Sequence, residues 1–185
     1  VSAQHRMPVH LSVDASAKKM VESATEETPG LDASASGQVD IWSTSTVAAR
    51  EKVSYWRDMV CNAVFGISVE TMPEQFSARI TARSAGPLRF AMSESNPYLI
   101  ARSKGDIDAS PSDHVSIYLQ LAGQTVSSMN DEIYTFEAND IGIYDGRQPF
   151  RSMHGGKRAI AVIPRAMIER RAPWLTRTPH HKLQG

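Results

Sequence analysis

Apolar and polar residues alternate with a period of two over much of the chain after residue 75, the pattern of β-strands with one buried face. The clearest segments are 76–83, 88–93 and 115–121, and shorter ones follow at 98–102, 125–129, 133–136, 141–144, 150–154 and 158–163. Turn-forming pairs such as Asn139-Asp140 and Gly155-Gly156 separate them. This spacing predicts about eight or nine short strands.

Helical periodicity replaces this alternation on both sides of the β region. Thr44-Ser45-Thr46 supplies good N-cap residues, and the segment from there to Val64 is predicted to be an amphipathic helix. Its apolar face would carry Val53, Trp56, Val60, Ala63 and Val64. A short closing helix is expected after Pro164, because proline at a helix start loses no needed hydrogen bond. Segment 103–113, with Gly105 and Pro111, is predicted to be an exposed loop.

The sequence divides into a central domain and two polar ends. Residues 1–43 are rich in Ser, Ala, Glu and Thr and are predicted to be a mobile tail, in which Val39 to Trp42 could dock as an arm. Residues 44–175 form the predicted domain, and 176–185 begin a linker. Many short strands with flanking helices favour a mainly β fold closed into a jelly-roll, or cupin-like, barrel, because closure removes exposed sheet edges.

Charge and cysteine content limit the partners. The chain has 20 basic and 20 acidic residues and a formal charge of +0, so it lacks the basic field that a free-standing DNA binder uses. Cys61, the single cysteine, is expected to be a small buried hydrophobe. No apolar run approaches the roughly 18 residues of a membrane span, and residues 1–30 lack a signal-peptide core. A cytoplasmic fragment that contacts no membrane is expected.

Six short motifs carry a family resemblance across roughly residues 45–175. They are Tyr55-Trp56-Arg57, Ala101-Arg102-Ser103, Leu119-Gln120-Leu121-Ala122-Gly123, Asn139-Asp140-Ile141-Gly142-Ile143-Tyr144-Asp145, Gln148-Pro149-Phe150 and Pro164-Arg165-Ala166. In this order the sequence resembles the effector-binding and dimerisation domain of AraC/XylS-type transcriptional regulators. The resemblance implies a small-molecule effector, a homodimer, and DNA contact only through a helix-turn-helix pair that follows in the family and is missing from this sequence.

Candidate effector contacts lie on the predicted strands. An apolar cavity with a few polar groups is what a sensor domain needs, and an arginine fork suits a carboxylate. Candidate walls are Phe90, Met92, Leu119, Tyr144 and Phe150, and candidate polar contacts are Arg89, Tyr118, Gln120 and Arg151. The alternatives are core packing for the apolar residues and solvent exposure for the arginines. A one-residue error in register would exchange the inward and outward sets.

The closing segment from Pro164 to Leu175 is the candidate dimer seam. Met167, Ile168 and Trp174 are its apolar residues, set among charged ones. Packing of these side chains on the domain's own strands is the alternative, because helices also form seams within single domains.

An enzyme remains the second class, and a barrel used only for protein contacts the third. A metal-binding cupin places histidines and a glutamate before a glycine such as Gly123, but the corresponding positions hold Ser110, Pro111, Ser112 and Ser116. His114 and His154 are isolated on or near strands, where either could be a polar group of the pocket, but satisfied or surface histidines are the preferred interpretation. His180-His181 is expected to be a solvated pair in the linker. No nucleophile elbow, phosphate loop or His-Glu-x-x-His motif occurs. The sequence therefore predicts no enzyme, no metal and no cofactor.

Overall fold

A computed structural model describes residues 38–129, 131–177 and 180–183. The chain divides into two units, residues 1–36 and 37–185. The predicted tail therefore falls mostly outside the described residues, and the architecture below is that of the second unit.

The described residues form one antiparallel sheet in the order β1-β3-β4-β9-β5-β8-β10, with β2 added to β4 and β6 between β9 and β7. The strands are β1 (Val39–Ser43), β2 (Ser68–Thr71), β3 (Ala78–Ala85), β4 (Leu88–Arg102), β5 (His114–Ala122), β6 (Thr125–Met129), β7 (Glu132–Phe136), β8 (Ile141–Asp145), β9 (Phe150–Pro164) and β10 (His180–Leu183). The mainly β prediction is confirmed. The predicted closed barrel is not formed, because β1 and β10 end the hydrogen-bonded path without pairing with each other.

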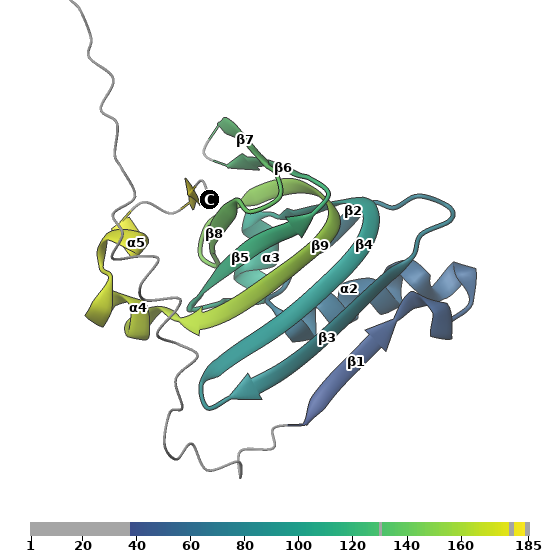
Figure 1. Cartoon of the computed structure of the whole chain (residues 1–185), viewed down its shortest axis with the longest axis horizontal. Coiled ribbons are helices and arrows are strands. Elements are labelled where there is room, and N and C mark those ends of the chain that lie inside the picture. Colours follow the sequence, from purple (N-terminus) through teal and green to yellow (C-terminus); the bar gives the residue numbers. More distant parts are fainter. Residues whose placement is uncertain (1–37, 130, 178–179, 184–185) are drawn as a thin grey trace, which may run out of the picture. The chain divides into compact units, whose positions relative to one another are not determined.

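Both end strands lie outside the predicted domain limits of 44–175. β1 pairs with β3 from Val39↔Arg83 to Ser43↔Arg79, so the described part of the predicted arm is a sheet strand. β10 pairs with β8 across the segment expected to be a linker. The two ends of the described chain thus extend opposite edges of the sheet (Figure 1).

Two long strands bend the sheet around its interior. β4 and β9 pair along almost their full lengths, with a register shift between Ser95 and Tyr98. Gly156 lies opposite Ser95 and has a φ of +82°, which favours glycine. A Cβ there would lie 2.0 Å from the carbonyl oxygen of Ala122, so only glycine lets β5 approach this closely. The register shift divides each strand into two halves: β4 pairs with β3 and then with β2, and β9 pairs with β6 and then with β5.

Helices cover one face and one end of the sheet. The helical segments are η2 (Thr44–Thr46), η3 (Ala49–Glu51), α2 (Lys52–Ala63), α3 (Lys104–Ala109), α4 (Arg165–Arg171) and α5 (Trp174–Arg177). α2 begins eight residues later than the predicted start at Thr44, because two 3₁₀ turns precede it. It buries Trp56, Val60 and Ala63, whereas Val53 is 46% exposed. Figure 1 shows α2 lying behind β3 and β4.

The predicted loop 103–113 contains a helix. Ser103 and Asp106 form a reciprocal capping box, which satisfies the first backbone amides of α3 and stabilises so short a helix. Burial and the hydrogen bonds from Ser103 and Ser68 act on the Asp106 carboxyl in opposite directions, and the net result is a lowered pKa.

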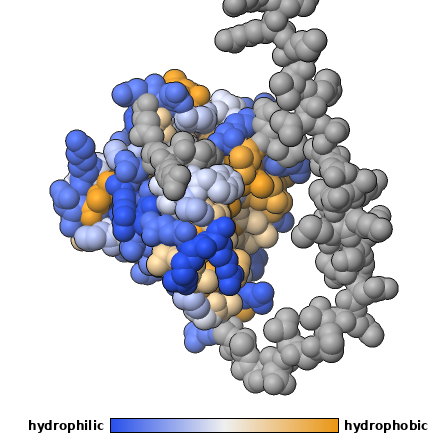
Figure 2. All heavy atoms as spheres, turned by 90° about the vertical axis from the view of Figure 1, so that its left-hand side faces the viewer, coloured by the Kyte–Doolittle hydropathy of each residue, from blue (hydrophilic) through white to orange (hydrophobic). Residues whose placement is uncertain are grey.

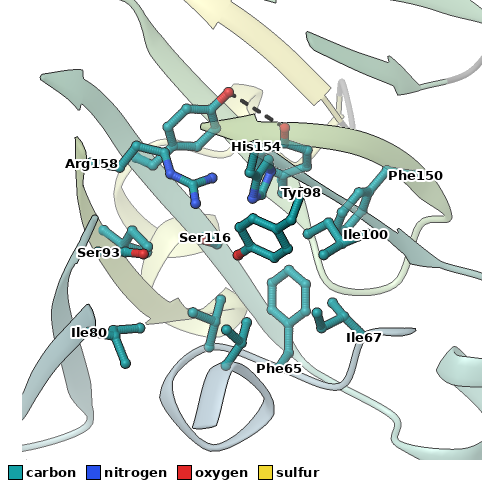
Figure 3. A pocket seen from close by; sticks show the side chains of 15 residues that line it. Phe65, Ile67, Ile80, Ser93, Tyr98, Ile100, Ser116, Phe150, His154 and Arg158 are labelled. Atoms are coloured by element: carbon teal, nitrogen blue, oxygen red, sulfur yellow. Dashed lines mark hydrogen bonds between the residues drawn. The ribbon is translucent and has the colours of Figure 1, made fainter. Parts of the chain in front are cut away.

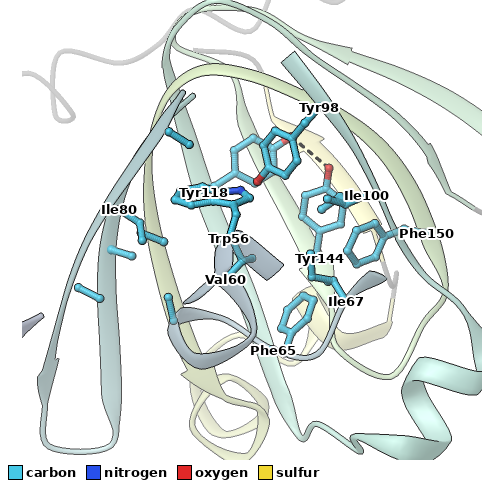
Figure 4. Close-up of a cluster of buried hydrophobic side chains, with 14 of the residues drawn as sticks. Trp56, Val60, Phe65, Ile67, Ile80, Tyr98, Ile100, Tyr118, Tyr144 and Phe150 are labelled. Carbon is cyan, nitrogen blue, oxygen red and sulfur yellow. Dashed lines mark hydrogen bonds between the residues drawn. The ribbon is translucent and has the colours of Figure 1, made fainter. Parts of the chain in front are cut away.

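The core lies between α2 and the inner face of the sheet. Trp56 is fully buried and makes an edge contact with Tyr98, with ring centroids 6.1 Å apart (Figure 4). A second edge contact joins Trp56 to Phe76, with centroids 5.9 Å apart. A smaller cluster of Val115, Ile143 and Ile168 packs α4 against β5 and β8.

The outer face of the sheet is also apolar, which is unusual for a strand face without a covering helix. Its partly exposed side chains include Phe90, Met92, Ile117, Leu119 and Ile141. Figure 2 shows hydrophobic side chains gathered on the flank that corresponds to the front of Figure 1.

Candidate functional site

An internal cavity of about 50 Å³ lies between α2 and the inner face of the sheet, with room for a few water molecules. Residues after α2 form one wall, and alternate residues of the strands form the others. The lining residues are Val60, Val64, Phe65, Ile67, Ile80, Ser93, Tyr98, Ile100, Ser116, Tyr118, Tyr144, Phe150, His154, Arg158 and Ile160. Most of this surface is apolar, and the polar groups converge from β4, β5, β8 and β9 (Figure 3).

A cluster of buried hydroxyls closes one side of the cavity. The Tyr144 hydroxyl hydrogen-bonds to Ser127 and lies 3.3 Å from Ser152 Oγ, and the two serine hydroxyls are 2.5 Å apart. The Tyr118 hydroxyl lies 3.5 Å from that of Tyr144, and the two rings stack. Burial, followed by the interaction with Tyr144, raises the pKa of Tyr118 far above its usual range. The Tyr118 hydroxyl is therefore a neutral hydrogen-bonding group.

Arg158 on β9 is the cavity's cationic residue. Its side chain shares a strand face with Ile160 and Val162, and its cross-strand neighbours are Ser93 on β4 and Gln120 on β5. The residue is 3% exposed. Within the described part of the chain its guanidinium has neither an ion pair nor a hydrogen bond, and its Nε is buried without a partner.

His154 lies four residues before Arg158 on the same strand and faces the same space (Figure 3). Its ring makes an edge contact with Tyr98, with centroids 5.9 Å apart. Its Nε2 is buried and has no hydrogen-bond partner among the described residues. Burial, followed by the charge of Arg158, lowers the pKa of His154 well below its usual value of 6.5. The imidazole is therefore neutral at physiological pH.

The structure brings three of the predicted effector contacts into the cavity, namely Tyr118, Tyr144 and Phe150. Gln120 is fully buried but has a structural role. Its side-chain amide donates to the carbonyls of Ala122 and Gly155, and its side-chain oxygen accepts from Thr125.

The other predicted contacts lie away from the cavity. Phe90, Met92 and Leu119 line shallow open grooves on the outer face of the sheet. Arg89 pairs with Asp40 of β1 at 3.4 Å. Arg151 pairs with Glu70 of β2 at 2.6 Å, on the exposed surface.

Arg158 and Ser93 were not among the predicted contacts, and His154 was expected to be an isolated satisfied or surface residue. The signal for Arg158 was its position in register with Ile160 and Val162, on the apolar face of a strand. A cation on a buried face needs a partner or a function. For β4, the apolar outer face made Phe90 and Met92 resemble core residues and so concealed the inward orientation of Ser93.

The candidate dimer residues differ in exposure. Ile168 packs against the chain's own sheet through Val115 and Ile143. Met167 is half-buried, and Trp174 on α5 is 54% exposed.

The cavity does not hold the ligands of a metal centre. Among the described residues, no group of three or more His, Cys, Asp or Glu side chains is positioned to hold a metal ion. Cys61 is half-buried, and its thiol lies near the backbone of Ile67. No helix within the described ranges has the length and apolarity needed to cross a membrane.

The fold and the cavity define an antiparallel β domain with a small, mostly apolar interior site. The chain belongs to the AraC-binding-like domain family, whose model matches residues 56–180. This confirms the resemblance seen in the sequence motifs.

Comparisons with individual proteins give a similar fold and a more distant sequence match. The AraC-like transcriptional activator CuxR has a similar fold, with a TM-score of 0.68 at 16% identity over 80% of this chain and 55% of that chain. A protein of Bacillus sp. (strain OxB-1), described as an uncharacterized protein in the nit 5' region, is 24% identical over 108 residues. That match covers 58% of this chain and 42% of the relative, so the chain spans less than half the relative's length. A cupin superfamily protein from Desulfitobacterium hafniense DCB-2, 11% identical over 52% of this chain and 83% of that one, has a TM-score of only 0.36, too low to support an argument about the fold.

Proposed function

We propose that this chain is the effector-sensing domain of an AraC-type transcriptional regulator, and that a small organic effector binds in the internal cavity. The observation that carries this proposal is the mostly apolar cavity into which Arg158, His154 and Tyr98 converge. Ligand sites combine apolar walls with a few fixed polar groups in this way. Family membership supports a role in regulation rather than catalysis.

The cavity limits the size of the effector. Its volume of about 50 Å³ accommodates only a few non-hydrogen atoms without rearrangement. A larger effector would have to displace the wall formed by Val64, Phe65 and Ile67, which follows α2 and belongs to no regular element. Binding would then favour the conformation in which this wall is displaced, because a ligand shifts an equilibrium only by its differential affinity for the two states.

A route from the cavity to the end of the domain runs through β5 and β8. Ser116 and Tyr144 line the cavity, and their chain neighbours Val115 and Ile143 point to the opposite face. There they contact Ile168 of α4. An effector that moves these two strands would therefore change the packing of α4, and through α4 the geometry of a separate DNA-binding domain.

We further propose that the regulator forms a homodimer through the α4–α5 surface. Trp174 offers a large exposed aromatic side chain, of the kind enriched at protein interfaces, and Met167 lies near it in sequence. Ile168 would hold α4 in place on the sheet through its contacts with Val115 and Ile143. Because the proposed regulator acts on DNA, its site of action would be the cytoplasm.

A ligand screen tests the sensing function. The domain would be heated with organic acids, amines, sugars and fatty acids, and its metal content measured on the same sample. A ligand that binds only the native state raises the melting temperature in a saturable way. Failure of every class to do so, or bound metal accompanied by turnover, would contradict the proposal. A regulator carrying the helix-turn-helix domain should then change its DNA affinity with the same compound.

A further inference from the structure

Among the described residues, Arg158 differs from the other buried arginines in having no hydrogen-bond or ion-pair partner. Arg102 donates to the carbonyls of Gly66, Ser110 and Gly146. Arg165 pairs with the buried Asp145. By contrast, Arg158 is directed into an apolar cavity and has no acceptor among the described residues. An unpaired buried cation is costly, so this position is best completed by an anion that arrives from outside.

The other cavity groups would accommodate an anion. Neither Asp nor Glu lines the cavity, so no carboxylate competes for Arg158 or repels a negative ligand. The polar neighbours are the hydroxyls of Ser93, Tyr98 and Ser116 and the neutral ring of His154. All of them can donate a hydrogen bond to an acceptor oxygen. The lining thus supplies one formal positive charge and several neutral donors.

The charge and shape of the site favour one class of anion. A single guanidinium balances one negative charge, whereas a phosphate monoester carries close to two at neutral pH. The planar fork of an arginine matches a carboxylate through two parallel hydrogen bonds. Opposite this polar end, Phe65 and Phe150 make an edge contact with centroids 6.1 Å apart, and Ile67 and Ile100 adjoin them. This end suits a short apolar or aromatic body.

We propose, on the basis of the sensing function above, that the effector is a small monocarboxylic acid whose carboxylate is bound by Arg158 and whose apolar body lies among Phe65, Ile100 and Phe150. Figure 3 shows the Arg158 guanidinium and the Tyr98 hydroxyl directed into the same space, with Phe65 across from them. Tyr98 and His154 would bind the remaining lone pairs of the carboxylate.

Paired acids and amides test this assignment. Butyrate and butyramide, and benzoate and benzamide, would be titrated calorimetrically into the domain at constant ionic strength, because each pair differs mainly in charge. At least one acid should bind about 30-fold or more tightly than its amide, as expected for a charged hydrogen-bonded contact in a buried site. Arg158→Met should remove this difference.

Arg151→Met provides the matched control. Arg151 lies on the same strand but is exposed and paired with Glu70, so its loss removes the same formal charge without touching the cavity. The acid should bind this variant as it binds the unmodified domain. If Arg158→Met does not fold, Arg158→Lys keeps the charge and loses the fork, and should weaken acid binding about 10-fold.

The outcomes separate this assignment from the sensing function. Acids and amides that bind equally well, with no change in Arg158→Met, would overturn the carboxylate assignment and leave sensing intact. Binding of no acid would also overturn it, and the amines and sugars of the wider screen would then decide whether sensing survives. A preference for inorganic phosphate or a phosphate ester would replace the carboxylate with another anion.

Discussion

Arg102 and Arg158 are both buried, but they have opposite energetic roles. Arg102 joins the segment after α2, the end of α3 and the turn after β8 through hydrogen bonds to Gly66, Ser110 and Gly146. Arg158 lines an apolar cavity and has no partner among the described residues. Their partners therefore distinguish the two: Arg102 is a structural residue and Arg158 is a ligand-binding candidate.

Replacing each arginine with methionine should change stability in opposite directions. Arg102→Met leaves buried carbonyls without donors and should lower the free energy of unfolding by about 3 kcal/mol or more. Arg158→Met removes an uncompensated charge and should raise it by about 1 kcal/mol or more. Urea denaturation of the unliganded domain measures both. Equal destabilisation by the two variants would show that Arg158 is a structural residue.

His154 should make the domain less stable in mild acid. Its pKa in the native state lies well below 6.5, so the unfolded state takes up a proton as the pH falls through about 6.5 while the native state does not. Stability then falls with pH, by about 1.4 kcal/mol per unit below that value, and is fully present above it. Between pH 7.5 and 5.5 the unmodified domain should lose about 1.4 kcal/mol more than His154→Gln. Parallel pH profiles would contradict the buried neutral state.

At the scale of elements, α2 is the helix that lies against the cavity, whose other walls are mostly strands. Val60 lines the cavity and Val53 lies on the exposed side of the same helix. The two valines therefore separate the effect of the cavity from the effect of helix propensity.

Val60→Ala should enlarge the cavity and destabilise the domain by about 2 kcal/mol. Val53→Ala should change stability by no more than about 0.5 kcal/mol. The Val60 variant should also favour acids one or two carbons longer than those preferred by the unmodified domain. Thermal unfolding and calorimetric titration of the two variants check both effects, and an unchanged chain-length preference would argue against binding beside α2.

Most strands could be predicted from sequence, because alternation and turn residues are local signals. The ends of the strands and their pairing partners were harder to predict from the sequence. β1 and β10 are held by long-range hydrogen bonds to β3 and β8, and segments of only four or five residues carry little local signal. The sequence predicts a loop where α3 forms, since its glycine and aspartates outweigh the capping pair of Ser103 and Asp106.

The site was predicted less completely than the fold. The candidate polar contact Tyr118 and the candidate walls Tyr144 and Phe150 line the cavity. On β4 the candidate walls Phe90 and Met92 lie on the outer face. A strand that is apolar on both faces does not show which face is inside, because the answer depends on which face α2 covers.

At the scale of the whole molecule, the proposed dimer rests on the exposure of Trp174. Trp174→Glu should place a charge in the dimer seam and shift the equilibrium to the monomer, which sedimentation velocity measures directly. Ile133→Glu is the matched control, because Ile133 is 76% exposed on β7, away from α4 and α5 in the sheet order. If both variants sediment as the unmodified domain does, the α4–α5 surface is not the dimer seam.

Methyl NMR of the domain with labelled isoleucines tests the central claim, that the effector binds inside the cavity. Ile80, Ile100 and Ile160 line the cavity, whereas Ile133 and Ile141 report on other surfaces. Saturation with the tightest-binding acid should shift the resonances of Ile80 and Ile100 strongly and leave that of Ile133 unchanged. Shifts confined to Ile141 and its neighbours on the outer face, with the cavity methyls unmoved, would contradict an internal effector site.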